Sequence, residues 1–484
     1  MVTTHDIEVH NIHYDSRKIQ KGDLFVALKG TNADGHKFIE QAIENGAKTV
    51  VIENDAVLPD SFFMHAGVAK IVVADARRAL AVMSANFYGH PARKLKLIGV
   101  TGTNGKTTTT YLIKQLLEHS PAFRGKVGLI GTIEYVAGDQ RMPATHTTPE
   151  SLELNQLFLR MVEKQCTHVV MEVSSHSLQQ HRVYGLEFEA AVFTNLTQDH
   201  LDYHGTMESY FASKKILFDD LPASSVAITN ADDAWGLKIT RDTHGSILTY
   251  GIAQRSDLHA TNISMSIART NFVIEHRNDK IEITSQLVGR FNIQNILAAC
   301  SVGIALGIPA AAIQSGVASL TAVPGRFERI VSPAGWTAII DYAHTPDALE
   351  KCLSTIHDVL PADTFNKIIT VFGAGGDRDK TKRPLMGKAV EAMSDIIIVT
   401  SDNPRTENPQ AIIDEVRAGI QRQENVFTES DRRNAIAKAA SMARKGDVVL
   451  VAGKGHEDYQ VIGTTKHHFS DREVVSEVIA STAQ

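Results

Sequence analysis

Short runs of apolar residues, many of them Val and Ile, recur along the chain, and segments with the period of an amphipathic helix separate them. In the N-terminal part, the apolar runs at 24–28, 49–52 and 71–73 predict strands. Helical periodicity is present at 38–45 and at 77–88. Strands that alternate with helices are typical of an α/β domain.

The same alternation restarts after the turn signal Gly89-His90-Pro91. A strand at 97–100 runs directly into a glycine-rich loop, and further strands are expected at 127–130, 168–173 and 191–194. This order favours a mainly parallel sheet, whose ligands bind at the carboxyl ends of its strands.

A second break lies around Val323-Pro324-Gly325-Arg326, after which strands are expected at 337–340, 367–372, 395–400 and 447–451. A chain of 484 residues is too long for one ordinary core. We therefore expect three α/β domains: an N-terminal domain at 1–91, a central domain with a phosphate loop at 92–326, and a Rossmann-like C-terminal domain at 327–484.

Composition narrows the class of protein. With 43% hydrophobic and 21% charged residues, the chain is ordinary for a globular protein, and a net charge of -6 gives no footprint for nucleic acid. The three cysteines are far apart, which favours a reducing cytoplasm over a disulfide framework. Neither a signal peptide nor an apolar run of about 18 residues occurs, so we expect no membrane insertion.

The loop after the strand at 97–100 reads Thr101-Gly102-Thr103-Asn104-Gly105-Lys106-Thr107-Thr108. Between a strand and a helix, its backbone N–H groups and the helix dipole can bind phosphates. Lys106 would contact the β- and γ-phosphates of ATP, and the Thr107 hydroxyl would bind Mg²⁺. A plain strand-to-helix turn is the alternative, because Val100 stands where the standard motif has its first Gly.

This loop resembles the ATP loop of the Mur ligases and of the related folylpolyglutamate synthetases. The resemblance spans essentially the whole chain, since four further motifs follow in family order at 171–176, 195–204, 291–295 and 341–344. It implies an ATP-dependent ligase of peptidoglycan synthesis, an activity tied to cell shape and cell division. It also implies that ATP is bound by residues of the loop and of three later motifs: Gly102, Thr103, Asn104, Gly105, Lys106, Thr107, Thr108, Asn295, Arg326 and Asp341.

The resemblance also implies metal sites. Glu172 ends an apolar strand and, with Thr107, would hold one Mg²⁺, whereas His200 lies at a second metal site. Lys214 matches the lysine that the family carries in carbamylated form, and that modification turns a cation into an anionic oxygen ligand. From the residues alone, Glu172 and His200 could equally be capping or surface groups and Lys214 a solvated helix residue.

For the substrates, the resemblance implies that the N-terminal domain binds the uridine nucleotide through Ser16, Thr31, Asn32 and Ala33. It places a UDP-N-acetylmuramoyl dipeptide, UDP-MurNAc-L-Ala-D-Glu, on Thr147, Thr148, Ser174, Gln180 and Arg182. The amino acid to be added would contact the C-terminal domain at these residues: Arg378, Asp402, Asn403, Pro404, Arg405, Gly453 and Glu457. The uridine residues also fit ordinary turns.

In the family, Asp-Asn-Pro-Arg marks the enzymes that add meso-diaminopimelate. The distal carboxylate that distinguishes this amino acid from lysine is a suitable bidentate partner for Arg405. A lysine-adding or a D-alanyl-D-alanine-adding homologue, a folylpolyglutamate synthetase and a P-loop regulatory or motor ATPase are the alternatives. We expect a monomer.

Overall fold

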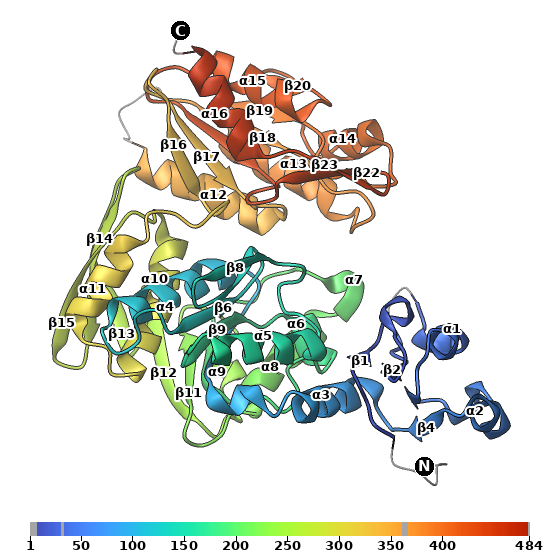
Figure 1. Cartoon of the computed structure of the whole chain (residues 1–484). Helices are drawn as coiled ribbons and strands as arrows, with labels where there is room; N and C mark the ends of the chain where they lie inside the picture. Colours follow the sequence, from blue (N-terminus) through green and yellow to red (C-terminus); the bar gives the residue numbers. More distant parts are fainter. Residues whose placement is uncertain (1–6, 31–32, 361–365, 483–484) are drawn as a thin grey trace. The chain divides into compact units, whose positions relative to one another are not determined.

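The computed structural model describes residues 7–30, 33–360 and 366–482. Thr31 and Asn32, both predicted to bind the uridine nucleotide, lie outside the described residues. The chain forms two compact units, one of residues 1–99, 125–189 and 220–222 and the other of residues 100–124, 190–219 and 223–484. Because the predicted central segment 92–326 contributes to both units, the three domain boundaries stay a prediction. Figure 1 shows the elements in the colours of the sequence.

The N-terminal part of the first unit is a four-stranded parallel sheet in the order β1-β2-β3-β4. Ile39 and Phe63 pack on one face of it, and Leu80 packs on the other. The elements are β1 (Ile12–His13), β2 (Leu24–Val26), β3 (Thr49–Ile52), β4 (Ala69–Val72), α1 (Ile39–Glu44), α2 (Asp60–Ala66) and α3 (Ala76–Phe87). The predicted strands and helices here are confirmed to within a few residues.

The rest of the first unit contains the strand run β9-β6-β7-β8, in which β6 is parallel to β9 and the other two pairs are antiparallel. Its elements are β6 (Val127–Ile130), β7 (Glu134–Ala137), β8 (Gln140–Pro143), α5 (Ser151–Glu163), β9 (His168–Glu172) and α6 (Ser175–Gln179). Glu172 is the last residue of β9, as predicted. The strand β5 (Lys96–Thr101) begins in this unit and ends in the other.

The second unit begins with the strand run β15-β14-β13-β12-β11-β10. Strands β10 to β13 are parallel, whereas β14 and β15 add antiparallel strands that the sequence analysis did not identify. The strands are β10 (Phe188–Phe193), β11 (Val226–Asn230), β12 (Ser246–Gly251), β13 (Leu258–Met265), β14 (Thr270–His276) and β15 (Asp279–Ser285). The helices are α4 (Lys106–His119), α7 (Leu201–His204), α8 (Met207–Asp219), α9 (Gly236–Ile239), α10 (Arg290–Ala305) and α11 (Ala310–Ser319).

The C-terminal sheet, also in the second unit, has the order β16-β17-β21-β18-β19-β20, and only β16 is antiparallel to its neighbour among these described strands. Its strands are β16 (Glu328–Val331), β17 (Thr337–Asp341), β18 (Ile368–Phe372), β19 (Ile396–Val399), β20 (Val426–Thr428) and β21 (Val448–Ala452). The chain moves outward from β17 to β20 and then returns to β21. Right-handed crossovers therefore place the helices before and after the return on opposite faces.

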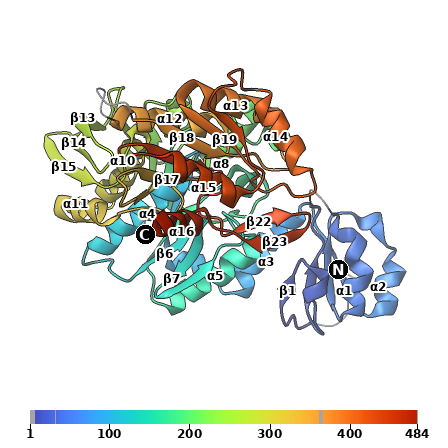
Figure 2. The ribbon, with the colours of Figure 1, turned by 90° about the horizontal axis from the view of Figure 1, so that it is seen from above.

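Helices α12 (Pro346–Val359), α13 (Lys382–Met393) and α14 (Pro409–Arg417) cover one face of this sheet, where Leu353, Met386 and Ile413 share a core. Helices α15 (Arg432–Met442) and α16 (Asp471–Thr482) cover the other face. Figure 2 shows α13 and α14 side by side next to β18 and β19. A separate hairpin, β22 (Tyr459–Ile462) and β23 (Thr465–His468), precedes α16.

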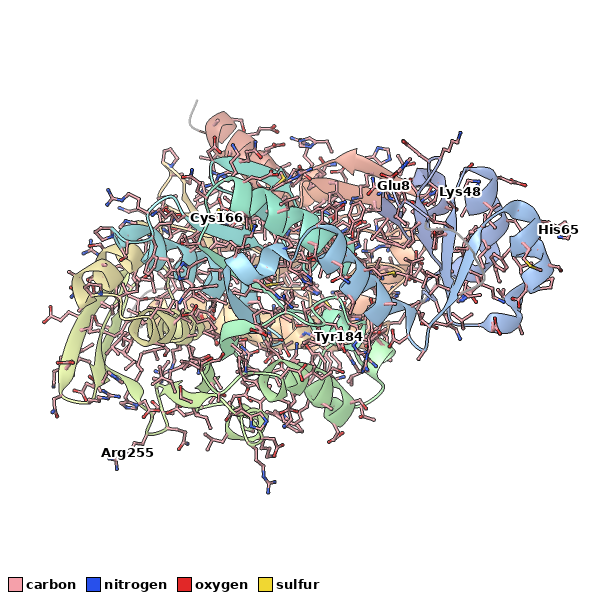
Figure 3. The ribbon with its side chains drawn as sticks, turned by 60° about the horizontal axis from the view of Figure 1, so that its bottom comes forward. Glu8, Lys48, His65, Cys166, Tyr184 and Arg255 are labelled. Atoms are coloured by element: carbon pink, nitrogen blue, oxygen red, sulfur yellow. The ribbon has the colours of Figure 1, made fainter. Side chains whose placement is uncertain are left out.

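Two further findings concern the cysteines and the helices of the described chain. Cys166, Cys300 and Cys352 are buried free thiols, and Cys166 is labelled in Figure 3. Over the residues that the structure describes, no helix is long and apolar enough to cross a membrane.

Candidate active site

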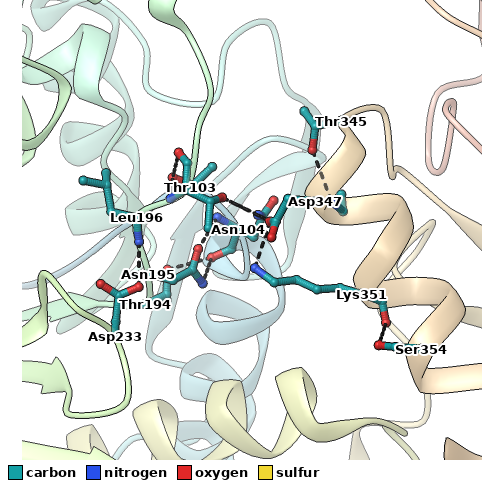
Figure 4. A network of polar contacts seen from close by, with 12 residues as sticks. Thr103, Asn104, Thr194, Asn195, Leu196, Asp233, Thr345, Asp347, Lys351 and Ser354 are labelled. Atoms are coloured by element: carbon teal, nitrogen blue, oxygen red, sulfur yellow. Dashed lines mark hydrogen bonds and ion pairs between the residues drawn. The ribbon is translucent and has the colours of Figure 1, made fainter. Parts of the chain in front are cut away.

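The phosphate loop lies between β5 and α4, and the segment after β10 fixes its backbone. Thr103 N–H donates to the Asn195 carbonyl at 2.8 Å, and Asn104 N–H donates to Asn195 Oδ1 at 3.0 Å. The Thr194 hydroxyl donates to the Asn104 carbonyl at 2.6 Å. The loop is thus held in one conformation by residues that follow the neighbouring strand, as Figure 4 shows.

Glycine is required at Gly105 for two reasons. Its φ of +86° is left-handed, and a Cβ at this position would overlap Asn295 Oδ1. Asn295, on α10, accepts from the Thr109 hydroxyl at 3.4 Å and donates to Asn292 Oδ1 at 3.1 Å. Asn295 therefore lies against the loop, and its predicted contact with the nucleotide stays a prediction.

Two lysines converge on one carbonyl oxygen of the loop. Lys106 Nζ donates to the carbonyls of Gly102 and Thr103, both at 2.9 Å, and Lys214 Nζ donates to the same Gly102 carbonyl at 2.9 Å. Lys214 is 1% exposed and lies over the Tyr210 ring at 4.5 Å. Burial first, and then the charge of Lys106, lowers the pKa of Lys214 well below its ordinary value. This environment favours the neutral amine.

His200 lies in the segment after β10, in a left-handed conformation with φ of +53°. Its Nε2 lies 3.4 Å from Asp199 Oδ2, and its side chain is 47% exposed. Its partial burial, together with the charges of Lys106 and Lys214, lowers the pKa of His200. A lowered pKa favours the neutral imidazole, the form in which histidine binds a metal.

Arg326 reaches the loop from the start of the C-terminal part. Its Nη2 donates to Thr107 Oγ1 at 3.3 Å, and its guanidinium lies 4.5 Å from the centre of the Tyr342 ring. The two oxygens of Asp341 accept from the backbone N–H groups of Phe327 at 2.6 Å and Ala343 at 2.7 Å, and its predicted contact with the nucleotide stays a prediction. In this structure Asp341 braces the backbone on both sides of the Arg326–Tyr342 contact.

A second polar contact joins the loop to α12. Asp347 Oδ2 accepts from Asn104 Nδ2 at 3.0 Å, from Thr197 Oγ1 at 3.1 Å and from Lys351 Nζ at 2.8 Å (Figure 4). The sequence analysis did not identify Asp347. Asp347 directly follows Thr345-Pro346, a typical helix start, so the sequence identifies it only as a residue of the first helical turn.

Within the first unit, Glu172 is 1% exposed and both of its oxygens accept from Thr132, Oε1 from the N–H at 2.9 Å and Oε2 from the hydroxyl at 3.0 Å. The Thr147 hydroxyl lies 3.0 Å from that of Thr132, and the Thr148 hydroxyl donates to the Glu172 carbonyl at 2.7 Å. The structure therefore brings the predicted Thr pair and the predicted metal ligand together.

Arg182 extends the same cluster. It donates to the Thr148 carbonyl at 2.7 Å and to Gln180 Oε1 at 2.8 Å, and its Nε lies 3.0 Å from Glu150 Oε1. The Ser174 hydroxyl accepts from Ser177 N–H at 3.1 Å and thereby caps α6. Glu150, missed by the sequence analysis, also pairs with Arg77 at 3.2 Å.

The described uridine residues show ordinary local roles. Ser16 is buried, and its hydroxyl donates to Gln41 Oε1 at 2.8 Å. The Ala33 carbonyl accepts from Gly30 N–H at 2.9 Å. These contacts neither confirm nor contradict nucleotide binding, and the assignment stays a prediction.

In the C-terminal sheet, Asp402 and Asn403 follow β19, whereas Gly453, Lys454 and Glu457 follow β21. Asn403 Nδ2 donates to Glu457 Oε2 at 2.8 Å. The Lys454 ammonium is fully buried and lies 3.1 Å from Asn403 Oδ1, 3.3 Å from Glu457 Oε2 and 3.4 Å from Asp402 Oδ1. Lys454 follows Gly453, which was predicted to bind the amino acid, but no role was predicted for Lys454 itself.

Arg405 and Arg378 flank the turn at Gly375. Arg405 Nη1 donates to the Gly376 carbonyl at 2.6 Å, and a Cβ on Gly375 would lie 3.0 Å from that nitrogen and 3.9 Å from Arg378 Cγ. Pro404 is buried beside them. The predicted amino-acid residues from three strand ends thus form one cluster of both charge signs, which suits an amphoteric ligand.

Beneath this cluster lies an ion pair that no sequence signal indicated. Arg432 on α15 and Asp471 on α16 are fully buried, with Nε–Oδ1 at 2.7 Å and Nη2–Oδ2 at 2.8 Å. Arg432 also donates to the Ala452 carbonyl at 2.9 Å. The pair thereby ties α16 to the end of β21.

No group of three or more His, Cys, Asp or Glu side chains in the described ranges is arranged to hold a metal ion. A cation would therefore be held by fewer than three such side chains, with other oxygens completing its coordination. Of the predicted donors, the Thr107 hydroxyl and the Glu172 carboxylate are hard oxygens, and Lys214 would supply one only after carbamylation.

Three family models match successive parts of the chain: "Mur ligase family, catalytic domain" at residues 8–88, "Mur ligase middle domain" at 100–303, and "Mur ligase, glutamate ligase domain" at 325–455. Two relatives are named UDP-N-acetylmuramoyl-L-alanyl-D-glutamate–2,6-diaminopimelate ligase. The protein from Clostridium botulinum is 46% identical over 475 residues, covering 98% of this chain and 95% of its own. That from Parabacteroides distasonis is 46% identical over 479 residues, covering 98% and 96%.

Solved structures also match this chain over nearly its whole length. One, also described as a UDP-N-acetylmuramoyl-L-alanyl-D-glutamate–2,6-diaminopimelate ligase, has a TM-score of 0.68 at 33% identity and covers 98% of this chain and 96% of its own. The MurF ligase of Thermotoga maritima in complex with ADP has a TM-score of 0.65 at 22% identity, covers 99% of each chain, and supports the fold alone. The chain belongs to the Mur ligase family and is an ATP-dependent, amide-bond-forming ligase.

Proposed function

We propose that this ligase adds meso-2,6-diaminopimelate to the γ-carboxylate of D-glutamate in UDP-N-acetylmuramoyl-L-Ala-D-Glu, a step in peptidoglycan precursor synthesis. One observation carries the proposal: the Asp402–Arg405 loop, the Gly375 turn and Glu457 lie together at the carboxyl edge of the C-terminal sheet. Arginine, amide and carboxylate groups in one cluster can bind both a carboxylate and an ammonium. The names of the relatives support the same substrate pair.

ATP is needed because an amine does not displace the oxide of a free carboxylate. The substrate's γ-carboxylate attacks the γ-phosphorus of ATP, and ADP leaves. Lys106 and the N–H groups of the loop stabilise the negative charge on the transferring phosphoryl group. The amine of diaminopimelate then attacks the acyl phosphate, inorganic phosphate leaves, and the amide forms.

The proposal includes Mg²⁺ and a carbamate on Lys214. Mg²⁺ would supply charge neutralisation for the phosphates. The resemblance assigns Thr107 and Glu172 to one Mg²⁺, His200 to a second metal site, and the carbamate as a further oxygen ligand. The chemistry of Lys214 fits: a neutral amine takes up CO₂ and releases one proton, and burial favours the neutral amine. The Gly102 carbonyl and the Tyr210 ring hold the nitrogen in place.

The two substrate regions divide the remaining roles. Arg182, held by Gln180 and Glu150, would bind a carboxylate of the muramoyl dipeptide, with Thr147, Thr148 and Ser174 beside it in the same unit. Ser16 and Ala33 would contact the uridine nucleotide. A monomeric, cytoplasmic enzyme that binds neither nucleic acid nor membrane completes the proposal.

The test is phosphate release and product mass with ATP, Mg²⁺, the UDP-linked dipeptide and a panel of amino acids. We expect product with meso-diaminopimelate and at least tenfold less turnover with lysine or D-alanyl-D-alanine, as expected for a carboxylate pair worth roughly 1.5–3 kcal/mol. Lys106→Ala should abolish product because the phosphates lose their fixed cation. Preferred use of lysine would replace the proposal with the lysine-adding alternative, and phosphate release without any amino acid would favour a regulatory ATPase.

A further inference from the structure

The hairpin β22–β23 is an unusual element in this fold. It belongs to no larger sheet in the described structure, and every residue of β23 is exposed. An isolated two-stranded hairpin is marginally stable at best in water. Contacts of β22 with another part of the chain must therefore help to hold it.

Those contacts go to the Asp402–Arg405 loop. Because Val461 pairs with Lys466 in an antiparallel ladder, alternate residues of β22 turn their backbone groups away from β23. Both backbone groups of Val461 point away from β23. Its N–H donates to Asn403 Oδ1 at 2.9 Å, and its carbonyl accepts from Arg405 N–H at 3.0 Å. The loop thus occupies the open edge of the hairpin.

Two further bonds complete this edge. Gly463 N–H donates to the Arg405 carbonyl at 2.8 Å, and Gln460 Nε2 donates to the Asp402 carbonyl at 2.6 Å. Arg405 and Ile462 form a parallel bridge. Both backbone polar groups of Arg405 are therefore bonded to the hairpin.

Arg405 needs this support because its φ of +52° is left-handed, a conformation that is strained for a residue with a Cβ. In that conformation its side chain reaches the Gly376 carbonyl at 2.6 Å. A relaxed backbone would redirect the guanidinium. The hairpin bonds offset the strain and select the direction in which Arg405 points.

We infer that the hairpin β22–β23, acting through Gln460 and Val461, is a specificity-determining element that positions Arg405 for the distal carboxylate of the amino acid. The inference rests on the proposed substrate, and it adds residues that need not touch that substrate. Gln460 and Val461 are positioning residues, since they act through the backbone of 402–405.

The experiment compares Gln460→Leu, which removes the donor to Asp402, and Val461→Pro, which removes the donor to Asn403, with Thr465→Val on the exposed strand as matched control. For each full-length protein, kcat/KM is measured with meso-diaminopimelate and with lysine, together with KM for ATP. Loss of about one net hydrogen bond should lower the ratio of the two kcat/KM values about three- to tenfold in both test variants. KM for ATP and the control variant should stay within about twofold of the unmodified protein.

A second readout does not depend on turnover. Hydrogen exchange of the Arg405 amide, which is bonded to Val461, should be at least about tenfold faster in both test variants than in the control. Unchanged exchange at Arg405, or an unchanged substrate ratio despite a lower melting temperature, would overturn the inference. If the unmodified protein preferred lysine, the proposed substrate would be wrong, and the exchange experiment alone would decide the role of the hairpin.

Discussion

At Lys214, burial changes the chemistry that an amine can do. An ammonium with 1% exposure, near the ammonium of Lys106, is unfavourable, so the side chain favours its neutral form. That form is the one that reacts with CO₂. The sequence pointed to Lys214 only through a motif, whereas the contacts with Gly102 and Tyr210 supply a physical reason.

Lys214→Ala should be almost inactive and should regain part of its activity with added short carboxylates such as acetate or formate. The added anion could take the place of the carbamate oxygens, whereas Lys215→Ala on the same helix, whose ammonium pairs with Asp219 and Asp242, should need no rescue. Initial rates across a carboxylate series, with intact-mass analysis of the unmodified protein, are the measurements. Full activity of Lys214→Ala would rule out the role.

Arg405→Ala should reduce turnover with meso-diaminopimelate and discriminate less against lysine. A charge-assisted pair contributes about 1.5–3 kcal/mol, which corresponds to a ten- to hundredfold change in relative kcat/KM. Arg405→Lys should recover little, because an ammonium lacks the planar two-pronged geometry of a guanidinium. Both amino acids are assayed on both variants; an equal loss for the two would mean that Arg405 only braces the loop.

At the scale of elements, the strands that carry the site were largely predictable. Buried parallel strands such as β9, β18 and β21 are built around runs of apolar residues, and this pattern is visible in the sequence. The hairpin was not predictable, because Thr465–His468 is entirely polar and shows no alternation of apolar and polar residues. Strands β14 and β15 do alternate between buried and exposed residues, and they were not predicted.

The site was predictable to the extent that its residues sit in contiguous motifs. Residues that act from a distance in sequence carry no such signal: Asp347 contacts Asn104 across 243 positions, and Arg432 meets Asp471 across 39. The sequence motif identifies Asp341 as a candidate site residue. The motif does not show whether its carboxylate contacts the nucleotide or only supports the backbone. Only the fold makes these pairings visible.

Glu407 links α13 to the Gly375 turn and gives a pH dependence. Its carboxylate accepts from both terminal nitrogens of the buried Arg383, from Asp377 N–H and from Lys380. The hydrogen bonds from Arg383, first, lower the pKa of Glu407 to about 2. A depressed carboxyl pKa stabilises the fold fully above the unfolded value of about 4.3, and this contribution is lost as pH falls toward 2.

Glu407→Gln should therefore lower the melting temperature most at pH 5 to 7, and the difference from the unmodified protein should shrink steadily below about pH 4. Thermal unfolding across this range, with the exposed Glu424→Gln as control, measures it. A difference that is constant between pH 3 and pH 7 would contradict the assigned role.

On the scale of the whole molecule, the buried pair Arg432–Asp471 joins the C-terminal helix to the floor of the amino-acid cluster. Asp471→Asn should destabilise the protein by about 3–5 kcal/mol, because it leaves a buried guanidinium uncompensated. Arg432→Met combined with Asp471→Asn should recover part of that loss. Denaturant unfolding of the single and double variants tests this, and a double variant less stable than Asp471→Asn would contradict it.

The Arg432–Asp471 ion pair also limits where the chain can be truncated. The matched ligase segment ends at residue 455, yet Asp471 and the hairpin that bonds to Arg405 both lie beyond it. A chain shortened to that boundary would keep every residue of the Asp402–Arg405 loop and lose what holds the loop in place. Since α16 also packs Val474 and Val475 into the core, the described residues after 455 stabilise the part of the C-terminal sheet that carries the Asp402–Arg405 loop. Affinity tags and fusion partners therefore belong after α16, and functional fragments need to retain it.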